Sequence, residues 1–108
     1  MRRGDIVTVS APGDYGKPRP AVIVQSDALA GTNSVLVCLM TCTLQASPLY
    51  RLTVHASREN GLKRTSQIMV DKIIVFNRIK CGPVMGRLER AAIIGLNAML
   101  VVVLGVGE

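Results

Sequence analysis

The stretch Gly16-Lys17-Pro18-Arg19-Pro20-Ala21-Val22-Ile23-Val24 sets a charged turn directly against an apolar strand. Each proline fixes its own φ, lacks an N–H group and pushes the preceding residue toward an extended conformation. Because Lys17 and Arg19 each precede a proline, their backbones have little freedom left. The pattern favours a strand entrance that aims the side chain of Arg19 in one direction, as an anion-binding residue requires. It is equally consistent with a plain strand entrance carrying one more solvated charge.

The composition around this stretch predicts a single domain covering residues 1–108. With 108 residues, of which 49% are hydrophobic, the chain supplies a core without disulfides or a metal. The formal net charge of +6 favours an acidic partner, such as a nucleic acid or an acidic peptide. Charge alone does not choose between these two partners.

Cysteine and histidine content argues against metal chemistry. Cys38, Cys42 and Cys81 stand at no metal-like spacing, and His55 is the single histidine. We therefore expect buried, reduced thiols, no metal site and no cofactor. The N-terminus enters strand-like sequence without the apolar region of a signal peptide, and the apolar stretch 91–104 is too short for a bilayer span. These features predict a cytoplasmic protein that does not contact membranes.

Alternating polar and apolar residues, separated by turn signals, predict a mainly β fold. The first strand should send Ile6 and Val7 to opposite faces, and from Leu88 the pattern becomes helical to about Leu104, with Glu89 in the first turn. Short strands followed by one terminal helix predict a small, strongly bent β-barrel with a C-terminal α-helix. The expected strands are 5–10, 21–25, 34–40, 49–54, 66–70 and 82–87, with 72–76 either continuing the fifth strand or forming another.

The sequence contains no catalytic triad, carboxylate pair, phosphate-binding loop or dinucleotide fingerprint. What remains is a set of loop and strand-end side chains that suit a phosphate. Tyr15 and Tyr50 offer flat rings on which bases could stack. The phosphate-competent residues are Lys17, Arg19, Thr41, Thr43, Arg64, Ser66 and Gln67.

The same residues carry a resemblance to the MazF/PemK family of toxin endoribonucleases. Each motif alone is weak, but five in the same order are specific and span nearly the whole chain. The resemblance implies an SH3-like β-barrel of the CcdB/MazF type with a C-terminal helix, a homodimer, and metal-independent cleavage of single-stranded RNA, usually mRNA, at short sequences. The motifs are Arg3-Gly4-Asp5-Ile6-Val7, Gly16 through Val24, the apolar strand ending in Met40-Thr41, Ser66-Gln67-Ile68-Met69-Val70-Asp71-Lys72-Ile73, and Gly86-Arg87-Leu88.

The resemblance also implies roles for individual residues. Arg19 takes the place of the family's strand-entry arginine, and Thr41 that of its strand-end hydroxyl. In such a mechanism the RNA 2′-OH attacks the adjacent phosphate and leaves a 2′,3′-cyclic phosphate and a 5′-OH. A guanidinium can fork two N–H donors onto that phosphate, and a small hydroxyl can fix it. Further RNA contacts are expected from Asp14, Tyr15, Lys17, Thr43, Arg64, Ser66 and Gln67.

The chain departs from the family pattern at two places. Some relatives carry a histidine in the first loop, whereas this loop reads Gly13-Asp14-Tyr15-Gly16. The general base is therefore unassigned, and the aspartate of this loop is a candidate that could instead form a turn. Other relatives follow the equivalent of Gln67 with a basic residue and a threonine, where this chain has Met69-Val70. Arg64 and Ser66 could replace part of that function.

Partners follow from the same resemblance. Family toxins are held inactive by an antitoxin whose flexible, acidic tail covers the RNA groove, and the +6 charge suits such a tail. The apolar terminal helix is expected to contribute a subunit interface.

Two other functions stay open at this stage. One is a non-enzymatic toxin of the same fold that acts on DNA gyrase, as the CcdB group does. The absence of tryptophan and the ending Leu104-Gly105-Val106-Gly107-Glu108 argue against it. The other is a non-catalytic barrel that binds RNA or an acidic peptide, which the shortage of acid–base residues supports.

Overall fold

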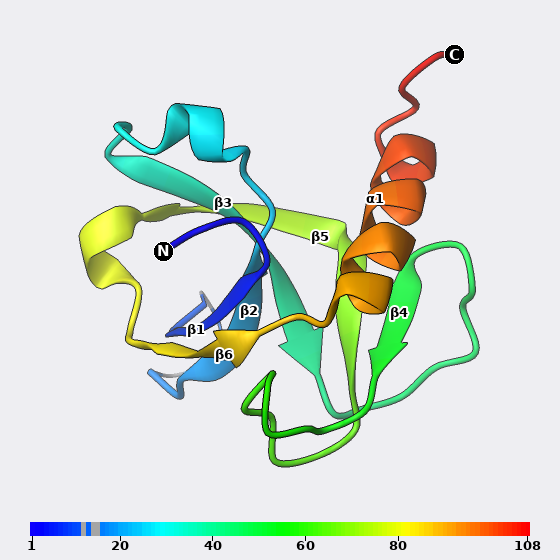
Figure 1. Cartoon of the computed structure of the whole chain (residues 1–108), viewed down its shortest axis with the longest axis horizontal. Helices are drawn as coiled ribbons and strands as arrows, with labels where there is room; N and C mark the ends of the chain where they lie inside the picture. The colour runs from blue at the N-terminus through cyan, green and yellow to red at the C-terminus, as the bar shows by residue number, and fades with distance from the viewer. Residues whose placement is uncertain (12, 14–15) are drawn as a thin grey trace.

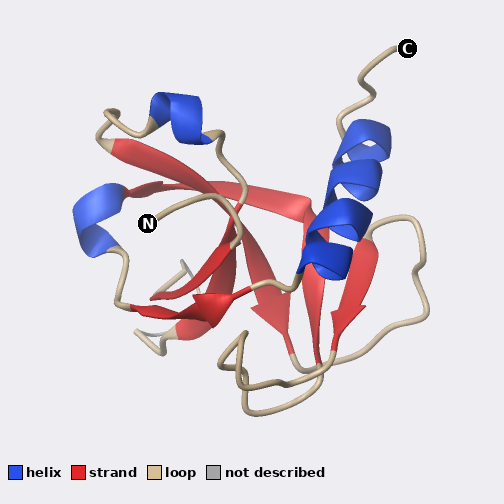
Figure 2. Ribbon diagram, viewed as in Figure 1, coloured by secondary structure: helices blue, strands red, loops and turns tan. Residues whose placement is uncertain are grey.

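The chain folds into a curled antiparallel sheet of six strands that carries one α-helix (Figure 1). This computed structural model describes every residue except 12, 14 and 15. The strands follow the order β4-β5-β3-β2-β1-β6, so β4 and β6 form the edges. The predicted mainly β fold with a C-terminal helix is confirmed. The elements are β1 (Asp5–Val9), β2 (Arg19–Ile23), β3 (Ser34–Thr41), β4 (Arg51–Val54), β5 (Ser66–Asn77), β6 (Val84–Arg87) and α1 (Arg90–Val103), with short 3₁₀ helices at Asp27–Leu29 and Arg78–Lys80 (Figure 2).

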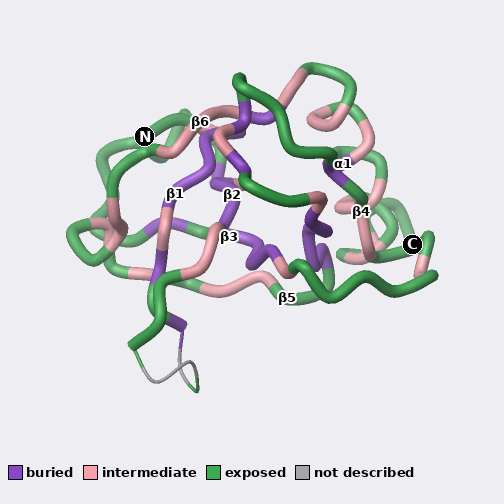
Figure 3. Tube along the Cα trace, turned by 90° about the horizontal axis from the view of Figure 1, so that it is seen from below, coloured by how far each residue is buried: buried purple, intermediate pink, exposed green. Residues whose placement is uncertain are grey.

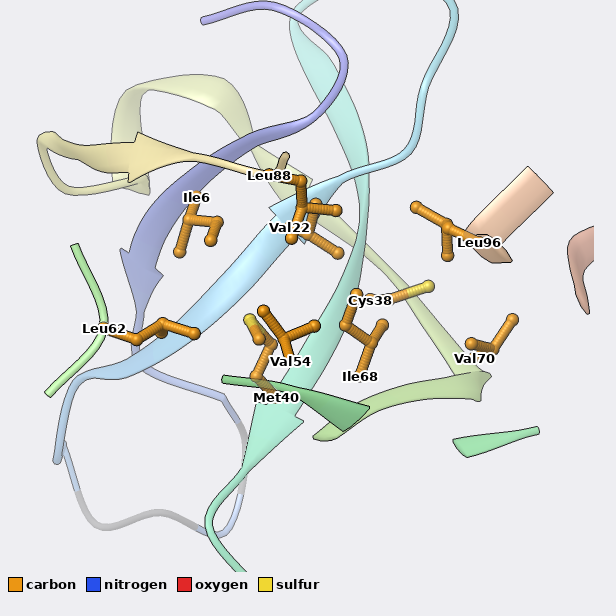
Figure 4. Close-up of a cluster of buried hydrophobic side chains, with 10 residues drawn as sticks. All are labelled: Ile6, Val22, Cys38, Met40, Val54, Leu62, Ile68, Val70, Leu88 and Leu96. Atoms are coloured by element: carbon orange, nitrogen blue, oxygen red, sulfur yellow. The ribbon is translucent and has the colours of Figure 1, made fainter. Parts of the chain in front are cut away.

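Side chains of the sheet divide into two buried clusters because successive residues of a strand point to opposite faces. Ile6 lies in the first cluster and Val7 in the second, as the alternation predicts. The first cluster joins residues of β1 to β5 with Leu96 of α1 (Figure 4). The second contains Val7, Val9, Ala11, Ala21, Ile23, Val35, Val37, Leu39 and Met69.

Strand β5 is continuous over 12 residues, so residues 72–76 extend the fifth strand rather than forming another. Its pairing with β3 shifts register between Cys38 and Met40. Such a shift bends a strand and increases its twist, which explains how one long strand follows the curled sheet. The expected fourth strand begins later than predicted, because residues 49 and 50 form a turn.

The start of the helix also differs from expectation. The helix begins at Arg90 rather than Leu88, and Glu89 is its N-cap residue rather than part of the first turn. The Glu89 carboxylate accepts hydrogen bonds from Ser57 Oγ at 2.7 Å and Asn60 Nδ2 at 3.5 Å. Glu89 thus ties the loop between β4 and β5 to the helix start, a long-range contact that a local pattern does not reveal.

Helix α1 lies against β4 and β5 and leaves much of its surface exposed (Figure 3). Gly95 permits the close approach, since a Cβ there would lie 3.3 Å from Leu52 Cδ1 on β4. Only Leu96 of the helix is fully buried, while Ile94 and Val101 are exposed. In the described part of the chain, no helix is long and apolar enough to cross a membrane.

The three cysteines are free, but they occupy different environments. Cys38 is buried, and this burial raises the pKa of its thiol to about 12. Cys81 is half-buried, and burial raises its thiol pKa as well. Cys42 is exposed, so the expectation of a buried thiol is wrong there. The reason is that β3 ends at Thr41, and Cys42 already belongs to the following loop.

Candidate functional site

Three strands begin or end close together at one end of the sheet. Because β2 pairs antiparallel with β3, and β3 with β5, the start of β2, the end of β3 and the start of β5 lie together. The pairing of β2 with β3 runs as far as Ala21 and Leu39, and Arg19 and Thr41 lie two residues beyond these at the same end. Thr41 in turn pairs with Gln67. The sheet register thus brings together residues that are far apart in sequence.

A cavity of about 160 Å³ opens at this junction. A second hollow of about 300 Å³ adjoins it and shares four of its lining residues. Arg19 and Ser66 line both hollows, whereas Thr41 lines the first and Arg64 the second. The lining residues are Arg19, Pro20, Met40, Thr41, Cys42 and Ser66 in the first hollow, and Thr8, Pro18, Arg19, Pro20, Cys42, Leu62, Lys63, Arg64, Ser66 and Met85 in the second.

The charged residues among this described lining are all cationic. Arg19 is half-buried at the start of β2, and Lys63 and Arg64 lie exposed on the loop before β5. Three cations around one concave surface attract an anion, and a partly buried guanidinium is suited to fork onto phosphate oxygens. The site is therefore chemically suited to hold a phosphodiester.

The hydroxyl of Thr41 is oriented by its own loop. Its Oγ1 accepts a hydrogen bond from the backbone N–H of Thr43 at 3.1 Å. A threonine hydroxyl carries one proton besides its acceptor lone pairs. With the acceptor side directed to Thr43, the proton can be donated to a ligand in the cavity that Thr41 lines.

Ser66 lines the same cavity as this hydroxyl. It is buried, and its Oγ donates to the backbone carbonyl of Arg64 at 3.0 Å. Its Oγ also lies 3.7 Å from Cys42 Sγ. Ser66 therefore fixes the turn that presents Arg64, in addition to lining both hollows.

The predicted site residues are distributed as follows. Arg19, Thr41, Arg64 and Ser66 line the two hollows, and Thr43 contacts Thr41 directly. Lys17 is exposed and precedes the lining residue Pro18. Asp14 and Tyr15 lie outside the described residues, so their contacts with RNA stay predictions.

Gln67 occupies a different environment from the one expected. The residue is 5% exposed and lines neither of the two hollows, but with Gln45 and Arg51 it lines a separate hollow of about 390 Å³. Its amide instead bonds to the loop between β3 and β4, through the backbone N–H and carbonyl of Gln45 at 3.0 and 2.9 Å. A direct contact with a ligand would have to displace these bonds.

Sequence reasoning did not name several lining residues as candidates, among them Cys42 and Lys63. Cys42 follows the strand-end Thr41 directly, and Lys63 precedes Arg64, so adjacency to predicted residues was the available signal. His55 lies close to the site although it is far from Ser66 in sequence. Its Nδ1 is 3.4 Å from Oγ1 of Thr65, the residue before Ser66, but His55 lines neither hollow. Within the described residues, no three His, Cys, Asp or Glu side chains gather as a metal site would need.

Comparisons with known proteins match the whole chain. A sequence model of the PemK-like, MazF-like toxin of type II toxin-antitoxin systems matches residues 2–104. The chain is 37% identical, over 107 residues and 98% of each chain, to the "Probable endoribonuclease MazF" of Mycolicibacterium smegmatis (strain ATCC 700084 / mc(2)155).

Solved structures share the fold at lower identity. An endoribonuclease in complex with its cognate antitoxin from a mycobacterial species has a TM-score of 0.82 at 21% identity, covering 100% of this chain and 98% of that chain. The Mycobacterium tuberculosis toxin MazF-mt6 has a TM-score of 0.82 at 19% identity, covering 96% and 99%. A MazE-MazF structure from Deinococcus radiodurans has a TM-score of 0.76 at 17% identity, covering 97% and 95%.

Proposed function

Because the chain belongs to the PemK-like, MazF-like family of toxins of type II toxin–antitoxin systems, we propose that it is a toxin endoribonuclease that cleaves single-stranded RNA at short sequences. The observation that carries the proposal is the placement of Arg19 and Thr41 in one cationic cavity where three strands end. The 37% identical relative, whose name is that of an endoribonuclease, supports the same activity.

The proposed reaction is a metal-independent transesterification. The 2′-oxygen of the RNA loses its proton and bonds to the adjacent phosphorus, while the bond from phosphorus to the 5′-oxygen breaks and that oxygen gains a proton. Arg19 binds the phosphate and stabilises the charge that grows on its oxygens, and it is also the candidate donor to the leaving 5′-oxygen. Thr41 donates a hydrogen bond from its hydroxyl to the same phosphate and keeps its own proton, which fixes the position of the phosphate. The products are a 2′,3′-cyclic phosphate and a 5′-OH.

The RNA strand on either side of the reacting phosphate would follow the cationic wall. Lys63 and Arg64 line the larger hollow, and Lys17 is exposed beside it. Cations that contact phosphates release counterions on binding, so the affinity for RNA should fall as salt rises. No described residue is assigned as the general base that takes the proton from the 2′-hydroxyl. Asp14 stays the candidate for this role.

Two protein partners complete the proposal. An antitoxin with a flexible acidic tail would cover the cationic hollows, which the +6 charge and the antitoxin-bound structural neighbour support. A second copy of the chain would cover the exposed apolar side of α1 and the residues after it, forming a homodimer. The full chain 1–108 would act as one toxin domain in the cytoplasm. The exposed apolar residues are Ile94, Val101, Val102, Leu104 and Val106.

The proposal is tested by incubating the purified protein with a long RNA in the presence of EDTA. Discrete fragments are expected, with 5′-OH ends that a polynucleotide kinase can phosphorylate and 3′ ends that cannot be extended until the cyclic phosphate is removed. RNA that stays intact while a known relative cuts it would refute the activity. Salt-sensitive RNA binding without any cyclic-phosphate product would indicate a binding module instead.

A further inference from the structure

We propose that Gln67 is a positioning residue that orients the Thr41 hydroxyl through the loop of residues 42–50 between β3 and β4. The inference rests on the proposed ribonuclease function and assigns to this site a residue that does not touch the RNA. A direct contact between Gln67 and RNA is the alternative that the experiment below decides. Three features of the described residues carry the inference: the burial of Gln67, its bonds to the loop, and the bonds from the loop to Thr41.

Gln67 is fixed in place on both sides of its amide. The Nε2 group donates to Gln45 O at 2.9 Å and to Thr53 Oγ1 at 3.2 Å. The Oε1 atom accepts from the Gln45 N–H at 3.0 Å and from Arg51 Nη1 at 3.3 Å. The residue is 5% exposed and its side chain makes four hydrogen bonds, so burial and bonding together restrict its rotation. Gln67 therefore holds Gln45, and with it the loop, in one position against β5.

The loop transmits this restraint to Thr41. Arg51 Nη1, which donates to Gln67, also donates to Thr43 O at 3.4 Å. The N–H of the same Thr43 donates to Thr41 Oγ1 at 3.1 Å. Both polar groups of the Thr43 backbone are thus engaged, one by Arg51 and one by the hydroxyl of Thr41. An unbroken series of hydrogen bonds connects the Gln67 amide with the Thr41 hydroxyl.

The orientation of a hydroxyl matters because its proton rotates freely about the C–O bond unless a neighbour restricts it. The Thr43 N–H occupies one acceptor direction of Thr41 Oγ1, which leaves the proton to point at a phosphate in the cavity. If the loop shifted, that N–H would move and the hydroxyl would sample other directions. Small misplacements of a catalytic group lower the rate far more than they lower substrate binding.

The chain contains a matched control for this inference. Gln25 is also a buried glutamine, 8% exposed, and its Nε2 donates to Leu29 O at 3.2 Å, Thr32 Oγ1 at 3.3 Å and Ser34 O at 3.5 Å. It holds the loop between β2 and β3, at the end of these strands opposite to the cavity. Gln25→Leu therefore removes a comparable set of hydrogen bonds between a buried amide and a loop, at a place far from Thr41.

The main experiment measures single-turnover and steady-state cleavage by Gln67→Leu, Gln67→Glu and Gln25→Leu. For Gln67→Leu we expect kcat to fall about tenfold, the value of one well-formed hydrogen bond, with KM unchanged. Gln67→Glu keeps the oxygen that accepts from the Gln45 N–H and Arg51 but sets a second oxygen against the Gln45 carbonyl, so its kcat should lie between those of Gln67→Leu and the unmodified protein. Gln25→Leu should cleave at the rate of the unmodified protein below its unfolding temperature.

Two further arms separate positioning from the alternatives. In a Thr41→Val background, Gln67→Leu should lower kcat by less than about twofold, because the hydroxyl it orients is gone. The Kd of an RNA with 2′-deoxyribose at the cleaved position should be the same for Gln67→Leu and the unmodified protein. Additive losses, or a weaker Kd, would overturn the proposal and support a direct RNA contact. Equal losses of kcat in Gln67→Leu and Gln25→Leu would overturn the positioning role and mean that Gln67 only contributes to the stability of the fold.

A readout without RNA keeps this inference distinct from the proposed function. Gln67→Leu should speed amide hydrogen exchange at Thr43 and Gln45, whereas Gln25→Leu should leave these two amides unchanged. If the unmodified protein cleaves no RNA, the ribonuclease proposal fails, and this exchange experiment still decides whether Gln67 holds the loop. Unchanged exchange at Thr43 in Gln67→Leu would overturn the positioning role.

Discussion

The two ends of strands β2 and β3 use similar residues for different purposes. At one end, Arg19 and Thr41 border a cavity of about 160 Å³. At the other, Arg78 Nε donates to Thr32 O at 2.9 Å and Thr32 Oγ1 lies 2.8 Å from Ser34 O, beside a hollow of only about 10 Å³. Arg78 and Thr32 thus stabilise a loop at the end where side chains fill the space. Arg19 and Thr41 line a cavity at the end where the space is open. Residue type alone does not distinguish a structural end from a ligand-binding end.

The largest test of this comparison exchanges the two arginines for alanine. Arg19→Ala should lower RNA cleavage by about 10²- to 10³-fold, the usual cost of removing a group that stabilises transition-state charge. Arg78→Ala should leave cleavage within about twofold, because it lies at the opposite end, and should lower the free energy of unfolding by about 1 kcal/mol through lost hydrogen bonds. Fragment yield over time and thermal unfolding measure the two effects. Equal cleavage by both variants would remove the functional distinction between the ends.

The two threonines provide a smaller version of the same test. Thr41→Val removes a donor to the phosphate and should lower kcat about tenfold. Thr32→Val removes a hydroxyl within 3.0 Å of the Leu29 carbonyl and should instead lower stability by about 1 kcal/mol with normal cleavage. Single-turnover rates and chemical denaturation separate the outcomes. A kcat loss in Thr32→Val would mean that the opposite end also contributes to the reaction.

The contrast also explains how far the sequence led. Local patterns were sufficient for the existence of the strands and of the terminal helix, since φ restriction and period-2 alternation are properties of neighbouring residues. They were not sufficient for the bounds, because the strand expected at 21–25 is found at Arg19–Ile23 and the one expected at 82–87 at Val84–Arg87. They did not reveal that Glu89 bonds to Ser57, because 32 residues separate the two.

The site itself shows the same limit. Arg19, Thr41 and Ser66 could be placed together because they begin or end strands, and strand ends meet where antiparallel strands pair. Gln67, next to Ser66 in sequence, was expected to face the same ligand. Adjacent residues of a strand point to opposite faces, and the amide of Gln67 is bonded to a loop whose path the sequence does not fix. The direction of a polar side chain therefore depended on tertiary contacts.

A third prediction uses the cysteines to probe the open space at one end. N-ethylmaleimide should react first with exposed Cys42, then with half-buried Cys81 and last with buried Cys38, since burial raises the thiol pKa of the latter two. Because Cys42 lines both hollows, its adduct should block RNA and lower cleavage severalfold. Mass spectrometry of the labelled protein gives the order. Cys42→Ser should cleave RNA normally, and N-ethylmaleimide should not lower its activity. If the reagent still inactivated Cys42→Ser, the inhibition would not come from an adduct in the cavity.

The last effect concerns the core that both ends share, and it appears only at high pH. Burial raises the pKa of Cys38 from 9.0 to about 12, so the folded state keeps the thiol proton in a range where the unfolded chain releases it. Below pH 9 both states are protonated and Cys38 adds no pH dependence. As the pH rises above 9 the unfolded state is favoured, by at most about 1.4 kcal/mol per pH unit. Denaturation at pH 8 and pH 10 should therefore show a steeper loss of stability in the unmodified protein than in Cys38→Ala. Strand β3 carries Cys38 between the two ends. The loss of stability above pH 9 should therefore raise amide exchange at Thr41 and at Val35 alike, relative to Cys38→Ala at the same pH. A rise at only one of these amides would mean that the two ends unfold separately.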